Sequence, residues 1–190
     1  MQFNMEDSWE RYALMTELIT RLQKVNQKIG KTILEKMLYL LQVLYKIDVG
    51  YDFEFYTYGP YSSQILNDLT QVEYWKGLKV ERISDLLNGY KITTDTKATF
   101  FIEKGRKYIE TPQIDNALNQ LTTTFGQYSA KDLELIATIV YVDQEIKTED
   151  MIPNQEQILG VVKQLKPRFS DEEINTKIEL LQNKGFVIEN

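Results

Sequence analysis

The 190-residue chain contains no cysteine and no histidine. The lack of cysteine excludes disulfides, thiol nucleophiles, redox switches and thiolate metal sites. The lack of histidine removes the most common general base and the most common zinc ligand. Serine–histidine–aspartate and cysteine–histidine catalysis are therefore excluded for this chain acting alone. We expect a protein that is not an enzyme and that uses no cofactor and no metal.

Long apolar runs and a positive charge balance are also missing. No run approaches the roughly 20 apolar residues that a membrane-spanning helix needs, and the start of the chain lacks the features of a signal peptide, so we expect a cytoplasmic protein. The net charge of −6 opposes a general affinity for nucleic-acid phosphates. Residues 129–190 carry 7 Lys and Arg against 12 Asp and Glu, so the C-terminal part is the acidic one.

The residues that are present predict a mainly α protein with small β elements. With 43% hydrophobic residues, 12 Tyr, 8 Phe and 2 Trp, the chain can build a substantial core. Apolar spacing predicts two helices, an aromatic strand over 51–58, a third helix over 61–76 and a hairpin over 80–93. A connecting helix over 113–125 and three acidic helices follow. This order indicates two winged-helix-like units, which we assign to residues 1–110 and 111–190.

Short sequence motifs predict where several helices and strands begin. Thr32–Glu35 and Ser170–Glu173 have the spacing of capping boxes, and Asn154 precedes another helix. The segments 100–102 and 186–188 are predicted to be short strands, the second of them closing the C-terminal unit.

The connecting helix has a narrow apolar seam, formed by Ile114, Leu118, Leu121 and Phe125. This seam suits either the packing of the two units against each other, which we favour, or the pairing of two chains. The sequence leaves the oligomeric state open, and a dimer remains one alternative.

The most distinctive motif joins a helix to an aromatic strand. Lys36-Met37-Leu38-Tyr39-Leu40 is followed by Phe53-Glu54-Phe55-Tyr56-Thr57-Tyr58-Gly59-Pro60-Tyr61-Ser62. Over about residues 30–75 this pattern resembles the bacterial Panacea (SocA-like) antitoxin domain and the related YwgA-like proteins. The resemblance implies a non-enzymatic protein that binds a protein partner, such as a toxin or a protease machinery. The acidic C-terminal part has no counterpart in that resemblance.

Two interpretations of the motif stay open. In the first, Gly59 and Pro60 set the backbone between the strand and the next helix, and Tyr39, Phe53, Phe55 and Tyr58 belong to the core. In the second, the motif contacts the partner, with Tyr56, Tyr58 and Tyr61 as the most suitable side chains for exposure. The candidate partner-binding residues are Lys36, Tyr39, Tyr56, Tyr58, Gly59, Pro60, Tyr61 and Ser62.

DNA binding through a winged helix is the alternative function. The chemistry of the expected recognition helices is unfavourable, because the C-terminal one begins Asp171-Glu172-Glu173 and the N-terminal one, 61–76, contains no arginine. A candidate basic patch would consist of Lys79, Arg82, Lys104, Arg106 and Lys107, with Lys91 and Lys97 nearby. Such residues more often form a solvated surface, so a protein partner is the preferred hypothesis.

A metal-dependent nuclease is a third, weaker hypothesis. Glu145-Ile146-Lys147 matches half of a common nuclease motif, with Asp132 or Asp143 upstream. That motif requires its residues on adjacent strands, with a cation between carboxylates. Here the residues are predicted on a helix and its exit, which indicates a chance match.

Overall fold

The computed structural model describes residues 5–83, 89–148 and 152–188 and confirms the mainly α fold class. The structure is 63% helical and has two antiparallel sheets of two strands each. In chain order the elements are α1 (Met5–Leu22), α2 (Lys31–Tyr45), β1 (Glu54–Tyr56), β2 (Gly59–Tyr61), α3 (Ser63–Tyr74), β3 (Leu78–Ile83), β4 (Gly89–Thr94), α4 (Ala98–Lys104), α5 (Arg106–Ile109), α6 (Pro112–Phe125), α7 (Ala130–Thr148), α8 (Gln155–Leu165) and α9 (Asp171–Gln182).

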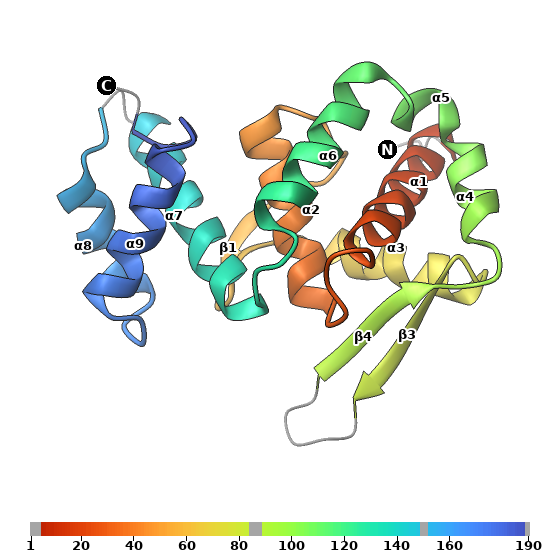
Figure 1. Cartoon of the computed structure of the whole chain (residues 1–190), viewed down its shortest axis with the longest axis horizontal. Coiled ribbons are helices and arrows are strands. Elements are labelled where there is room, and N and C mark those ends of the chain that lie inside the picture. The colour runs from red at the N-terminus through yellow and green to blue at the C-terminus, as the bar shows by residue number, and fades with distance from the viewer. Residues whose placement is uncertain (1–4, 84–88, 149–151, 189–190) are drawn as a thin grey trace.

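Helix α7 bridges the N-terminal and C-terminal elements. It packs against α2 and β2 on one side and against α8 and α9 on the other (Figure 1). Its residues from 133 to 140 are all buried, which explains why its apolar residues follow no single face. The buried side chains form one continuous core from Tyr12 to Val187, so the two ends of the chain share that core.

Helix α6 does not occupy the connecting position that the sequence indicated for 113–125. It packs against α1, α2 and α5, and the role of the bridge between the N-terminal and C-terminal elements belongs to α7. The seam of Ile114, Leu118, Leu121 and Phe125 is buried within the chain. At its end, the ring of Phe125 lies 6.0 Å from that of Phe186. The structure therefore favours internal packing of this seam over pairing of two chains.

Two of the predicted helix starts are confirmed. Ser170 and Asn154 each form a reciprocal capping box, with Glu173 and Gln157 respectively. The box predicted at Thr32–Glu35 is wrong, because α2 begins at Lys31 with Gly30 as its N-cap. Contacts with strand β4 fix the chain just before this helix. The amide of Ile92 donates to the carbonyl of Ile29 at 2.7 Å. A Cβ on Gly30 would lie 2.9 Å from the Tyr90 carbonyl oxygen, so a glycine is needed at the N-cap.

Three predicted strands need correction, while the hairpin of β3 and β4 is confirmed. The segment 51–58 contains only the short strand β1, and Pro60 lies in β2 rather than in the first turn of a helix. Residues 100–102 belong to α4, where Phe101 is buried against the rings of Trp9 and Trp75. Residues 186–188 form no strand, so the C-terminal helices have no wing there. Apolar aromatic runs favour strands locally, but tertiary packing overrides that preference.

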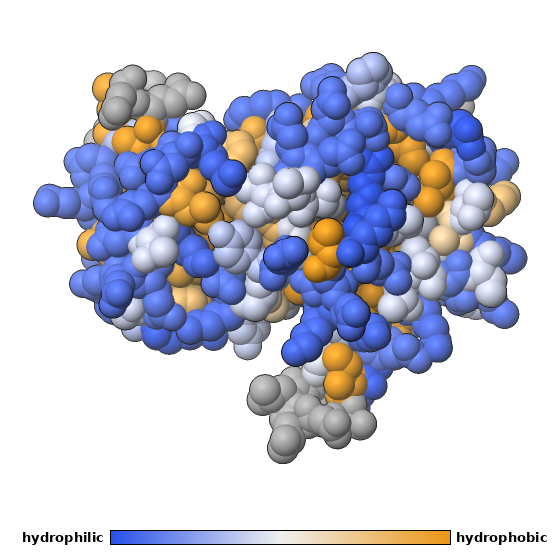
Figure 2. All heavy atoms as spheres, in the orientation of Figure 1, coloured by the Kyte–Doolittle hydropathy of each residue, from blue (hydrophilic) through white to orange (hydrophobic). Residues whose placement is uncertain are grey.

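The surface in Figure 2 is mostly hydrophilic, with small separate apolar patches. Within the part of the chain that the structure describes, no helix is long and apolar enough to cross a membrane.

Candidate partner-binding hairpin

The motif forms a β-hairpin with a two-residue turn, Thr57 and Tyr58. Strands β1 and β2 pair with Tyr56 opposite Gly59 and Phe55 opposite Pro60. The hairpin rests on α7 and α2, because β2 contacts both helices and the ring of Phe55 lies 4.9 Å from that of Tyr141. The sequence that was expected to link a strand to a helix therefore folds back on itself, and helix α3 starts only at Ser63.

A buried lysine holds the second strand of this hairpin. The Lys36 side chain is 0% exposed, and its Nζ donates a 2.6 Å hydrogen bond to the carbonyl oxygen of Pro60. Its Nζ also lies 3.5 Å from the carboxylate of Glu35. Burial lowers the pKa of Lys36 and raises the pKa of Glu35, while their mutual attraction opposes both shifts. Lys36 therefore positions the hairpin from inside and cannot contact a partner itself.

A second buried lysine, from the opposite end of the sequence, holds the turn. Lys166 follows α8, and its Nζ donates a 2.5 Å hydrogen bond to the carbonyl oxygen of Thr57. The same Nζ lies 2.9 Å from Oε1 of Glu134, and Arg168 donates to Oε2 of Glu134 at 2.5 Å. Because Lys166 and Glu134 are both 4% exposed, this ion pair is shielded from water. The hairpin is thus anchored from both α2 and the α8–α9 loop.

Gly59 is required by both backbone conformation and space. Its φ of +88° lies in the region that side-chain-bearing residues rarely adopt. A Cβ at this position would lie 3.0 Å from the hydroxyl oxygen of Thr138 in α7. Gly59 therefore allows the hairpin to approach α7 closely, which places Pro60 within reach of Lys36.

The structure divides the candidate partner-binding residues into two groups. Tyr56 and Tyr58 are 64% and 58% exposed, and Tyr61 is half-buried with its ring 5.8 Å from that of Tyr56. The second group is buried and consists of Lys36, Tyr39, Gly59, Pro60 and Ser62. The exposed tyrosines can contact a partner, whereas the buried residues can only hold those tyrosines in place.

Tyr39 and its neighbours form part of the support. The ring of Tyr39 meets that of Phe53 edge to face at 5.2 Å, and burial raises the pKa of the Tyr39 hydroxyl well above its ordinary value. The alternative that assigned the motif to the core therefore fits Tyr39. It does not fit Tyr58, which is exposed at the turn.

The cations of the candidate basic patch do not gather in one place. Lys79 and Arg82 are on β3, whereas Lys104 ends α4 and Arg106 and Lys107 belong to α5. Carboxylates also accompany several of them. Lys79 pairs with Glu81 at 2.7 Å, and Arg106 lies between Glu103 and Glu110.

The residues of the weak nuclease match all lie on α7, as the sequence indicated. Asp132 is paired with Lys177 at 2.9 Å, and Asp143 is buried and paired with Lys147 at 3.0 Å. Glu145 lies on the surface. Across the described ranges, no group of three or more acidic residues is arranged to hold a metal ion.

No protein-family model and no curated protein matches this chain. The resemblance over residues 30–75 therefore rests on the sequence motif alone.

Sequence reasoning missed the C-terminal contribution to the hairpin, namely Glu134, Thr138, Lys166 and Arg168. One signal was available. Glu134 is the one charged residue among 133–140, a segment that is otherwise apolar except for Thr138, and a lone charge in a buried helix requires a partner of opposite charge. The identity of that partner depends on the fold, because Lys166 is 32 positions further along the chain.

Proposed function

We propose that this chain is a non-enzymatic protein-binding module, and that Tyr56 and Tyr58 are the centre of its binding surface. The observation that carries the proposal is the combination of two exposed tyrosines with a hairpin that two buried lysines hold from inside. Tyrosine provides a large contact area at low entropic cost, and it is enriched among residues that dominate binding energy. A turn that is already ordered loses little entropy when a partner binds.

The finer proposal is an antitoxin-like or adaptor protein of a prokaryote, cytoplasmic, whose partner is a toxin or a component of a protease machinery. It draws on the resemblance to the Panacea domain, whose Lys-Tyr helix and Tyr-Gly-Pro strand correspond here to Lys36, Tyr39 and Tyr58–Pro60. The winged-helix regulator remains the alternative. The dispersion of the cations and their pairing with carboxylates favour the protein partner over DNA.

The test is a pull-down of the tagged full-length chain from its source cells at low salt, followed by native mass spectrometry. We expect one protein in stoichiometric amount. The double variant Tyr56→Ala and Tyr58→Ala should weaken the complex by about 2 kcal/mol, or about 30-fold, because both side chains lie at the centre of the proposed contact.

Tyr74→Ala is the matched control, because Tyr74 is 78% exposed on a different part of the surface. This control should retain the partner, and all variants should unfold at an unchanged temperature, since the three side chains are exposed. Retention of the partner by the double variant would contradict the proposed surface. Co-purified nucleic acid that leaves as the salt concentration rises would instead support the DNA-binding alternative.

A further inference from the structure

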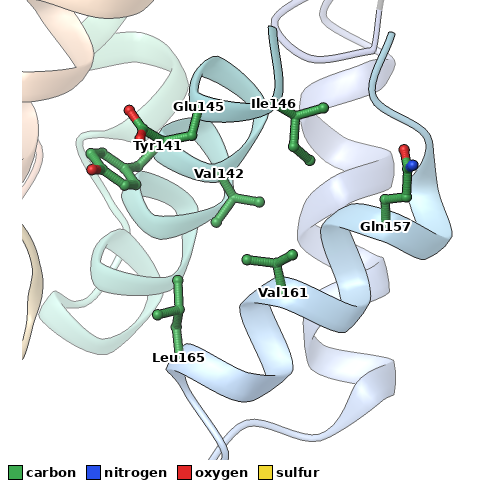
Figure 3. A pocket seen from close by; sticks show the side chains of 7 residues that line it. All are labelled: Tyr141, Val142, Glu145, Ile146, Gln157, Val161 and Leu165. Carbon is green, nitrogen blue, oxygen red and sulfur yellow. The ribbon is translucent and has the colours of Figure 1, made fainter. Parts of the chain in front are cut away.

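An apolar groove lies between α7 and α8, next to the hairpin. Its volume is about 310 Å³. The apolar side chains that line it are Val142 and Ile146 from α7 and Val161 and Leu165 from α8, and Figure 3 shows these side chains gathered between the two helices. Val161 and Leu165 are 39% and 40% exposed, so this stripe of α8 lacks a covering element among the described residues.

The groove is continuous with the hairpin surface. Tyr141 lines one end of the groove, and its ring packs against that of Phe55 in β1. At the same end, Leu165 precedes Lys166, the residue that holds the carbonyl of Thr57. A partner that covers the tyrosines of the turn can therefore extend towards the groove.

The spacing of the lining residues indicates the shape of the occupant. Gln157, Val161 and Leu165 are four residues apart, so they form one row along α8, and the facing row on α7 has the same pitch. Two parallel apolar rows at the surface form a trough that a third helix can fill with its own apolar face. The volume of about 310 Å³ is sufficient for a few aliphatic side chains.

The charged residues at the edge of the groove indicate which charge the polar face of a bound helix would carry. Among the seven lining residues Glu145 is the one ionisable group besides Tyr141, and none is a lysine or arginine. Glu156, at the start of α8, adds a second exposed carboxylate. Lysines of these helices are engaged elsewhere: Lys147 pairs with Asp143, and Lys163 pairs with Asp171. A basic helix is therefore favoured at this rim and an acidic one is repelled.

We infer that the α7–α8 groove binds a basic amphipathic helix of the protein partner, with apolar side chains of that helix between Val142, Val161 and Leu165 and a lysine or arginine beside Glu145. This inference rests on the proposed function, because it assigns the segment of the partner that lies beside the tyrosine turn. The hairpin and the groove then bind two neighbouring parts of one partner.

Two synthetic peptides of about 16 residues test the inference. Both have leucine at every third or fourth position and are cross-linked across one turn to hold the helix, since short free helices are marginal in water. One peptide has lysines on its polar face and the other has glutamates at the same positions. We expect fluorescence anisotropy at low salt to show that the full-length chain binds the basic peptide at least about tenfold more tightly than the acidic one.

Substitutions in the groove test whether the peptides bind there. Val161→Asp should weaken the basic peptide at least about tenfold, because it places a charge among the apolar side chains. Glu145→Lys, at an exposed position, should reverse the preference between the two peptides, and circular dichroism checks that the variant keeps the fold. Equal binding of both peptides, no binding of either, or unchanged affinity in both variants would overturn the inference.

The hairpin variants separate this inference from the proposed function. Tyr56→Ala with Tyr58→Ala should leave the affinity for the basic peptide within about twofold, because the peptide covers only the groove. If the groove variants have no effect on the peptides while the hairpin variants still lose the partner, the groove inference fails and the proposed function stands. The reverse pattern would overturn the tyrosine surface and leave the groove.

Discussion

At the scale of the residue, the most demanding feature is the buried carboxylate of Glu134. It lies on a helix whose neighbouring positions are apolar, and it faces Lys166 and Arg168. Removing an ion pair from water costs several kcal/mol per ion, and this cost is offset only when both partners are present. Glu134 therefore supplies the counter-charge that the buried Lys166 needs, and Lys166 holds the turn through the carbonyl of Thr57.

We predict that Glu134→Gln destabilises the protein by about 3 kcal/mol. The substitution keeps the size of the side chain but leaves the buried ammonium of Lys166 without a counter-charge. Urea unfolding followed by circular dichroism measures the change. Glu81→Gln is the control, because the Lys79–Glu81 pair is exposed to solvent, and such surface pairs contribute little to stability. Equal effects of the two substitutions would contradict a structural role for the buried pair.

At the scale of the element, the hairpin of β1 and β2 depends on contacts outside itself. Two strands of three residues each are too short to be stable alone. The buried lysines and the close approach of Gly59 to Thr138 supply what the strands lack. The hairpin therefore belongs to the same cooperative unit as α2 and α7.

Glycine substitutions test this dependence. Gly59→Ala is predicted to destabilise the protein by more than about 1 kcal/mol, because alanine is disfavoured at φ +88° and its Cβ approaches Thr138. Gly160→Ala is the matched substitution in α8, where the new Cβ meets nothing within 4 Å. It should stabilise the protein by about 0.5–1 kcal/mol, because alanine favours a helix interior. Thermal unfolding compares the two, and destabilisation by both would contradict the proposed geometry.

The sequence predicted the elements unevenly, and the reason differs from element to element. Helix starts at Ser170 and Asn154 were predictable because a capping box is satisfied by residues three positions apart. The strand predicted at 100–102 became a helix because Phe101 packs against Trp9 and Trp75, which local propensity cannot register. For the candidate site, the motif indicated the segment, whereas the division into exposed and buried residues came from the structure.

At the scale of the whole molecule, the tyrosines limit stability at high pH. Burial raises the pKa of Tyr108 to about 12 and also raises the pKa values of Tyr39 and Tyr51. In the unfolded chain these hydroxyls ionise near the ordinary value of 10, so their contribution is fully present below pH 10 and is lost as the pH rises through the folded values. Lys36, whose pKa is lowered, acts with the opposite sign, but only below its ordinary value of 10.5.

We therefore predict that the free energy of unfolding falls between pH 10.5 and 12, by about 1.4 kcal/mol per pH unit for each tyrosine that stays protonated in the folded state. Urea titrations at several pH values measure this slope. Tyr39→Phe should make the slope shallower, because it removes one buried hydroxyl and keeps the ring against Phe53. Tyr74→Phe, at an exposed position, should leave it unchanged. A slope that is the same in both variants would exclude Tyr39 as a contributor.

The sequence by itself determined the fold class, the helix caps at Asn154 and Ser170, and the segment that contains the candidate site, because each of these depends on residue types at short spacing. Only the tertiary structure decided that α7 bridges the N-terminal and C-terminal elements, that Lys36 and Lys166 hold the same hairpin, and that Tyr56 and Tyr58 remain exposed. These features depend on contacts between residues far apart in the chain, and burial of a charge or a ring is a property of its neighbours in space.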